Sequence, residues 1–197
     1  MRLAILSASK NYWRVYSNKR PVRVARMIHY FAYGSNLHPL RLIERVPSAQ
    51  LVAAAECRQH RLRFNKTSVD GSSKCNMLGT DSEADLVYGA IYRLHAAHKA
   101  DLDAFEGRGA GYEDARILVS SNEKQYRCFT YLAQPTHITE NLKPYRWYKQ
   151  LVCLGAKYLH FPAAYIASIE SVTSIEDPDL DRRRKNDALI ARILNYR

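Results

Sequence analysis

The stretch of this chain best suited to binding a small anion is residues 30–36, which read Tyr-Phe-Ala-Tyr-Gly-Ser-Asn. Large aromatic residues alternate with smaller ones as far as Tyr33, which predicts a β-strand, and Gly34 permits a tight turn. Ser35 and Asn36 are favourable helix N-caps. Together they would present backbone N–H groups at the positive end of a helix, where a carboxylate or an oxyanion binds. An ordinary strand-to-helix connection fits the same spacing.

Glu106 is an acidic residue at the end of a predicted helix, beside a glycine-rich segment. It ends a helical pattern over residues 95–105 and directly precedes Gly107, with Gly109 and Gly111 close behind. A carboxylate held away from water can act as a general base and then as a general acid. The alternative is a solvated glutamate at the end of a helix, because exposed carboxylates are common.

Residues 30–36 resemble the signature that opens the γ-glutamylcyclotransferase family. Three later segments resemble the same family in the expected order, and the whole resemblance covers about residues 28–172. The later segments are residues 64–76, residues 102–107 with Gly111 and Tyr112, and residues 148–156.

The resemblance implies a reaction that needs no metal or organic cofactor. The α-amine of a γ-glutamyl amide attacks its own γ-carbonyl, which gives 5-oxoproline and a free amine or amino acid. Glu106, in the pattern Leu-Asp-x-x-Glu-Gly, is then the proton-transfer residue. The residues expected to bind the substrate are Tyr30, Phe31, Ala32, Tyr33, Gly34, Ser35, Asn36, Tyr148 and Tyr131. For Tyr148 the alternative is a half-buried aromatic at a helix start.

The bulk composition predicts a soluble globular protein of 197 residues, with 47% hydrophobic and 25% charged residues. No apolar run approaches the roughly 20 residues that a membrane span needs. The seven histidines show no HxH or HExxH spacing, so no metal site is expected. Four cysteines without CxxC pairs indicate free thiols and a cytoplasmic location. The four are Cys57, Cys75, Cys128 and Cys153.

The net charge of +11 is concentrated at the amino terminus. Seven basic residues and no acidic one lie within residues 1–26, which leaves a net charge of +4 for the rest of the chain. The open interpretations are a targeting segment, a disordered arm contacting nucleic acid or anionic lipid, and translation that starts at Met27. A second hypothesis for the whole protein is a non-catalytic module that binds γ-glutamyl or other anionic ligands. A homodimer is possible.

The order of elements predicts an α+β protein, and the resemblance implies a small mixed β-barrel flanked by helices. We expect a basic extension over residues 1–27, the family domain over 28–172 and a charged helical tail over 173–197. Within the domain, residues 65–83 are rich in Asn, Ser, Gly and Asp and predict a loop. Asn65, Lys66, Ser72 and Lys74 are expected to be solvated there, and Asn76 is the exception. The other expected elements are strands over 49–64, 86–94, 112–120 and 125–133, and helices over 37–46, 95–105, 144–160 and 162–171.

Overall fold

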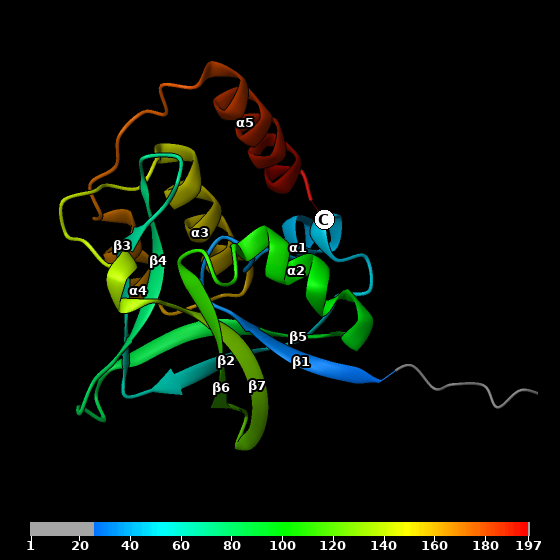
Figure 1. The fold of residues 1–197 in the computed structure, drawn as a ribbon. Helices are drawn as coiled ribbons and strands as arrows, with labels where there is room; N and C mark the ends of the chain where they lie inside the picture. Colours follow the sequence, from blue (N-terminus) through cyan, green and yellow to red (C-terminus); the bar gives the residue numbers. More distant parts are fainter. Residues whose placement is uncertain (1–25, 197) are drawn as a thin grey trace, which may run out of the picture.

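Five strands close into a barrel in the computed structural model, which describes residues 26–196 (Figure 1). The strand order is β1-β5-β2-β6-β7, and a parallel contact between Tyr30 and Phe129 closes the ring against otherwise antiparallel pairs. The α+β prediction with a small mixed barrel is therefore confirmed. The strands are β1 (Met27–Ala32), β2 (Gln50–Arg58), β5 (Leu86–His95), β6 (Tyr112–Ser121) and β7 (Lys124–Ala133).

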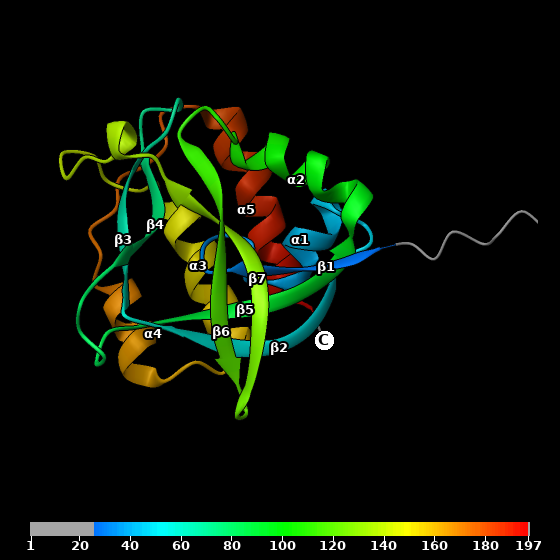
Figure 2. The same cartoon turned by 60° about the horizontal axis from the view of Figure 1, so that its bottom comes forward.

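The helices lie outside the barrel, and α1 and α2 are neighbours at one end of it (Figures 1 and 2). Helix α3 contacts both α4 and α5, and α4 lies on the opposite side of the molecule from α2 in both views. Within residues 26–196 we find no helix long and apolar enough to cross a membrane. The helices are α1 (Pro39–Arg45), α2 (Lys99–Glu106), α3 (Arg146–Tyr158), α4 (Ala163–Glu170) and α5 (Leu180–Leu194), with 3-10 turns η1 (Ala96–His98) and η2 (Pro135–His137).

The expected loop over residues 65–83 is wrong, because most of it forms strands. Strand β3 (His60–Thr67) pairs antiparallel with β4 (Ser73–Gly79), and the two make a separate sheet. Asn65 and Asn76 are buried, and their side chains bond to each other at 3.3 Å. The polar composition of the segment is typical of a loop, but here the two amide side chains are buried and hydrogen-bonded to each other.

The single extended segment expected over residues 49–64 is divided in two. Gln59 has a φ of 57° and ends β2 one residue before β3 begins. This left-handed residue turns the chain out of the barrel and into the second sheet. The sequence alternation continues across the break, so periodicity alone did not reveal it.

The expected N-caps of α1, Ser35 and Asn36, are also wrong. His38 caps the helix, and its Nδ1 accepts a hydrogen bond from the Leu40 N–H at 3.2 Å. Burial lowers the pKa of His38 to about 4, so its ring stays neutral and Nδ1 can accept this hydrogen bond. The side chain of Asn36 is thereby left to make contacts elsewhere.

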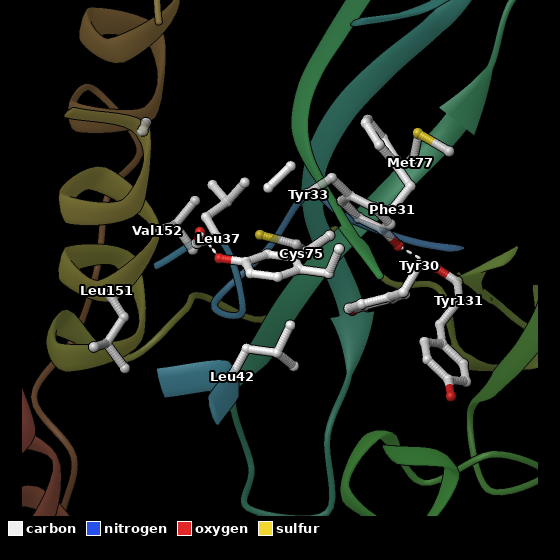
Figure 3. Close-up of a cluster of buried hydrophobic side chains, with 14 of the residues drawn as sticks. Tyr30, Phe31, Tyr33, Leu37, Leu42, Cys75, Met77, Tyr131, Leu151 and Val152 are labelled. Atoms are coloured by element: carbon white, nitrogen blue, oxygen red, sulfur yellow. Dashed lines mark hydrogen bonds between the residues drawn. The ribbon is translucent and has the colours of Figure 1, made fainter. Parts of the chain in front are cut away.

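The barrel packs tightly against the strand that carries the signature. The side chain of Phe31 lies over Gly89 of β5, where an added Cβ would come within 2.4 Å of the Phe31 ring. Figure 3 shows Phe31 among the buried side chains that surround it, including Tyr33 and Met77. Gly89 therefore sets how closely β1 and β5 pack, and with it the position of the turn that follows β1.

A buried carboxylate attaches α5 to α3. Asp177 accepts hydrogen bonds from Arg182 Nε at 2.7 Å, from Trp147 Nε1 at 2.8 Å and from the Asp179 N–H at 2.9 Å. The hydrogen bonds from Arg182 chiefly lower the pKa of Asp177 to about 2. Because the folded pKa is depressed, this stabilisation is complete above the usual carboxyl pKa and is lost as the pH falls towards 2.

We expect Asp177→Ala to lower the free energy of unfolding by about 2–4 kcal/mol at neutral pH, because it leaves buried donors unpaired. Urea denaturation measures the change. Asp181→Ala removes an exposed carboxylate from the first turn of α5 and serves as the control, with an effect below about 0.5 kcal/mol. Equal effects of the two substitutions would contradict this assignment.

Candidate active site

A narrow cavity lies where the turn after β1, the end of α2 and the beginning of α3 meet. Eight of the residues that line it were predicted to carry the function, and they come from segments far apart in the sequence. The cavity is lined by Tyr30, Tyr33, Gly34, Ser35, Asn36, Cys75, Glu106, Tyr112, Tyr131 and Tyr148; of these, Cys75 and Tyr112 were not among the predicted site residues and Glu106 was the predicted proton-transfer residue.

Glu106 is held at the cavity by two donors. Its Oε1 accepts a hydrogen bond from Asn36 Nδ2 at 2.7 Å and one from Arg45 Nη1 at 3.2 Å. Gly107 ends α2 in the left-handed conformation, with a φ of 64°, so Glu106 occupies the last helical position. The side chain is only 18% exposed. The carboxylate is therefore oriented and largely shielded from water.

Arg45 is a residue of this site that sequence reasoning missed. Its Nη1 also donates to Asn36 Oδ1 at 2.9 Å, so Arg45, Asn36 and Glu106 form a closed triangle of contacts. The helical spacing of Arg41 and Arg45 places both on one face of α1, and this signal was present in the sequence. What the sequence did not show is that α1 turns this face towards α2.

The turn after β1 offers hydrogen-bond donors to the cavity. The Leu37 N–H donates to the Gly34 carbonyl at 3.1 Å and closes the turn. Within residues 26–196, the N–H groups of Gly34, Ser35 and Asn36 have no acceptor, and all three residues line the cavity. Three successive unpaired N–H groups suit an anionic oxygen of a ligand.

Gly34 is required by a close approach rather than by an unusual φ. An added Cβ would lie 3.2 Å from Cys75 Cβ and 3.3 Å from the Tyr148 hydroxyl oxygen. That hydroxyl also accepts a hydrogen bond from the Cys75 N–H at 3.0 Å. The Tyr148 ring is thus fixed against both the turn and β4.

The remaining wall of the cavity is made of anchored tyrosines. Tyr33 donates its hydroxyl hydrogen to the Tyr131 carbonyl (Figure 3), and Tyr112 donates to the Cys75 carbonyl. Burial raises the pKa of Tyr30, Tyr33 and Tyr112 well above the usual value. These hydroxyls therefore remain protonated at neutral pH.

Two predicted substrate-binding residues, Phe31 and Ala32, are not placed at the cavity. Both are fully buried in the core. The backbone carbonyl of Phe31 accepts a hydrogen bond from Thr130 Oγ1 at 2.8 Å, which joins β1 to β7. Phe31 packs on β5 and is hydrogen-bonded to β7, so these two residues of the signature position strand β1.

The sequences of several known proteins are similar to this chain. A sequence profile of the AIG2-like family matches residues 86–169. The γ-glutamylcyclotransferase of Bos taurus is 32% identical over 148 residues, which cover 73% of this chain and 77% of the bovine protein. The chain belongs to the γ-glutamylcyclotransferase family. The Homo sapiens γ-glutamylcyclotransferase is 30% identical over the same length.

A solved structure described as γ-glutamyl cyclotransferase has the same fold. It superposes with a TM-score of 0.73 at 24% identity, and the match covers 85% of this chain and 99% of that one. The family resemblance predicted from residues 30–36 and the later segments is therefore confirmed by the sequence comparisons, and the solved structure confirms the fold.

The thiol of Cys75 lies in the cavity wall, and the other three cysteines are buried elsewhere. Burial raises the pKa of Cys75 and of Cys128 to about 12 and that of Cys57 to about 11, so the nucleophilic thiolate is scarce at neutral pH.

We expect the native protein to react slowly with a thiol reagent at about pH 8, and all four cysteines to react after unfolding. Rapid labelling of Cys75 in the native protein, detected by peptide mass spectrometry, would be inconsistent with this environment.

Proposed function

We propose that this protein is a γ-glutamylcyclotransferase that uses Glu106 for proton transfer. The observation that carries the proposal is the position of the Glu106 carboxylate, which lies in the same cavity as the unpaired N–H groups of residues 34–36. The named activity of the bovine and human relatives supports it. The substrate class is a small γ-glutamyl amide, and the products are 5-oxoproline and an amine or amino acid.

The reaction begins with the α-ammonium group of the substrate. Glu106 removes one proton, and the freed amine attacks the γ-carbonyl carbon to form a five-membered ring. The N–H groups of the turn stabilise the negative oxygen that develops on this carbon, or they hold the α-carboxylate. The bond to the leaving nitrogen then breaks as Glu106 returns its proton to that nitrogen. The ring nitrogen then gives up its second proton to Glu106, which passes it to the released amine. Both protons lost by the ammonium group therefore end on the leaving group, which departs as an ammonium ion.

The cavity also restricts the shape of the substrate. A γ-glutamyl chain cyclises only when its amine lies over its carbonyl, and holding it there can contribute several kcal/mol, within the roughly 7–11 kcal/mol available from orientation. The anchored tyrosine side chains provide rigid walls for this purpose, because Tyr33 and Tyr112 each donate a hydrogen bond to the backbone.

We propose that the protein acts in the cytoplasm, which is supported by four free, buried cysteines.

We expect Glu106→Gln to lower kcat for 5-oxoproline release by about 10³-fold or more, because the amide cannot accept the proton. Its folded structure, followed by circular dichroism and thermal unfolding, should be unchanged. Glu113→Gln, which alters an exposed glutamate on β6, is the matched control and should retain full activity. Substantial turnover by Glu106→Gln would rule out this role.

Asn36 is expected to position Glu106. Replacing Asn36 with Ala removes the 2.7 Å hydrogen bond, and we expect kcat to fall by about 10–100-fold while KM changes less, because misplaced catalytic groups act mainly on the chemical step. Steady-state kinetics with γ-glutamyl-alanine measure the two constants, and Asn141→Ala, at an exposed site, is the control. An increase in KM alone would instead assign Asn36 to substrate binding.

A further inference from the structure

One buried lysine beside the cavity has no anionic partner. Lys66, on β3, is only 6% exposed. Within residues 26–196 its ammonium group forms neither an ion pair nor a hydrogen bond, and it lies over the Tyr112 ring, with the centroid 4.5 Å from Nζ. A buried charge without a partner is unfavourable, so such a group is a candidate for binding a ligand of opposite charge.

Lys74, the neighbouring lysine, does have an anionic partner. Lys74 lies opposite Lys66 in the pairing of β3 with β4, and it is paired with Asp70 Oδ2 at 2.7 Å and with Ser72 Oγ at 2.7 Å. Asp70 is therefore already engaged. The Glu106 carboxylate is likewise engaged by Arg45 at 3.2 Å. Burial lowers the pKa of Lys66, and these two carboxylates oppose that shift without contacting the ammonium group directly.

Lys66 contacts Tyr112, which lines the cavity, and does not itself line it. The hydroxyl of Tyr112 bonds to the carbonyl of Cys75, next to the Gly34 turn, whereas the ring contacts Lys66. Lys66 also packs against Gly111, where an added Cβ would lie 2.8 Å from its Nζ. The ammonium group therefore lies beside the loop that follows Glu106 and against a tyrosine of the cavity wall.

Gly111 gives Lys66 access to this position. It has a φ of 125°, and its missing side chain leaves the space that the lysine occupies together with the His137 ring. An isolated bridge between Lys66 and Ile138 holds the backbone of β3 against the segment after η2. Three segments therefore fix the position of the lysine: β3 itself, the loop that contains Gly111 and the segment around η2.

We propose that Lys66 binds the carboxylate of the leaving amino acid, which makes it a specificity-determining residue for γ-glutamyl amino acids. This inference rests on the proposed function. The leaving group is the part of the substrate that extends beyond the glutamyl cavity, and it starts at the nitrogen that receives the proton from Glu106. When the leaving group is an amino acid, a carboxylate follows that nitrogen after one carbon and completes an ion pair with Lys66. When the leaving group is an amine without a carboxylate, Lys66 has no ion-pair partner.

The test compares γ-glutamyl-alanine with γ-glutamyl-alaninamide, which differ only in the charge of the leaving group. We expect the wild-type protein to prefer the carboxylate substrate by about tenfold or more in kcat/KM, the effect of a charge-assisted hydrogen bond in a shielded site. Lys66→Gln should abolish this preference by lowering kcat/KM for γ-glutamyl-alanine and leaving the value for the amide within about threefold. Lys66→Arg should retain part of the preference, because it keeps the charge.

Lys124→Gln, at an exposed position at the start of β7, is the matched control and should keep the wild-type preference. Equal rates of the wild-type protein on both substrates would overturn the inference while leaving the proposed function intact, and this result does not require any variant to fold. An equal loss on both substrates in a folded Lys66→Gln would also overturn it and would assign Lys66 to the glutamyl carboxylate or to packing. Inactivity of the wild-type protein on both substrates would contradict the proposed function, and the inference would fall with it.

Discussion

The contacts among Asn36, Glu106 and Arg45 are the interaction on which the site depends. They join the turn after β1, the end of α2 and the end of α1, three segments that no regular backbone pairing connects at this point. A carboxylate that is largely shielded from water needs hydrogen-bond donors, and here one of the two, Asn36, belongs to the turn that also carries the unpaired N–H groups. The proton-transfer group and the anion-binding turn are therefore held in a fixed relation by the same bonds.

The barrel supports this arrangement through its packing. Gly89 lets Phe31 lie directly on β5, and the Thr130 hydroxyl fixes the Phe31 carbonyl, so the end of β1 has little freedom to move. The tyrosines of the wall add a second constraint, because burial keeps their hydroxyls protonated and their hydrogen bonds go to backbone carbonyls. A rigid and poorly hydrated cavity strengthens the electrostatic contacts inside it, which is the environment that a developing oxyanion requires.

Much of the fold and most of the cavity could be predicted from the sequence. The strand, turn and helix around Gly34 and the position of Glu106 at the end of α2 came from local patterns, and local patterns determine such features. The errors share a physical cause. Residues 65–79 have the polar composition of a loop, so Asn65 and Lys66 were expected to be solvated, yet both are buried and Asn65 is hydrogen-bonded to Asn76. Arg45 was missed because its partner lies 61 residues away. Phe31 and Ala32 support the site from the core, a distinction that a motif does not express.

The central claim is that the substrate attacks itself, without a water molecule as the nucleophile. The most direct test supplies γ-glutamyl-alanine to the wild-type protein in heavy-oxygen water and analyses the products by mass spectrometry. Cyclisation predicts 5-oxoproline and alanine, neither of which carries heavy oxygen introduced by the reaction. Glutamate that has gained one heavy oxygen would show hydrolysis by water and would contradict the account, even though the same bond is broken.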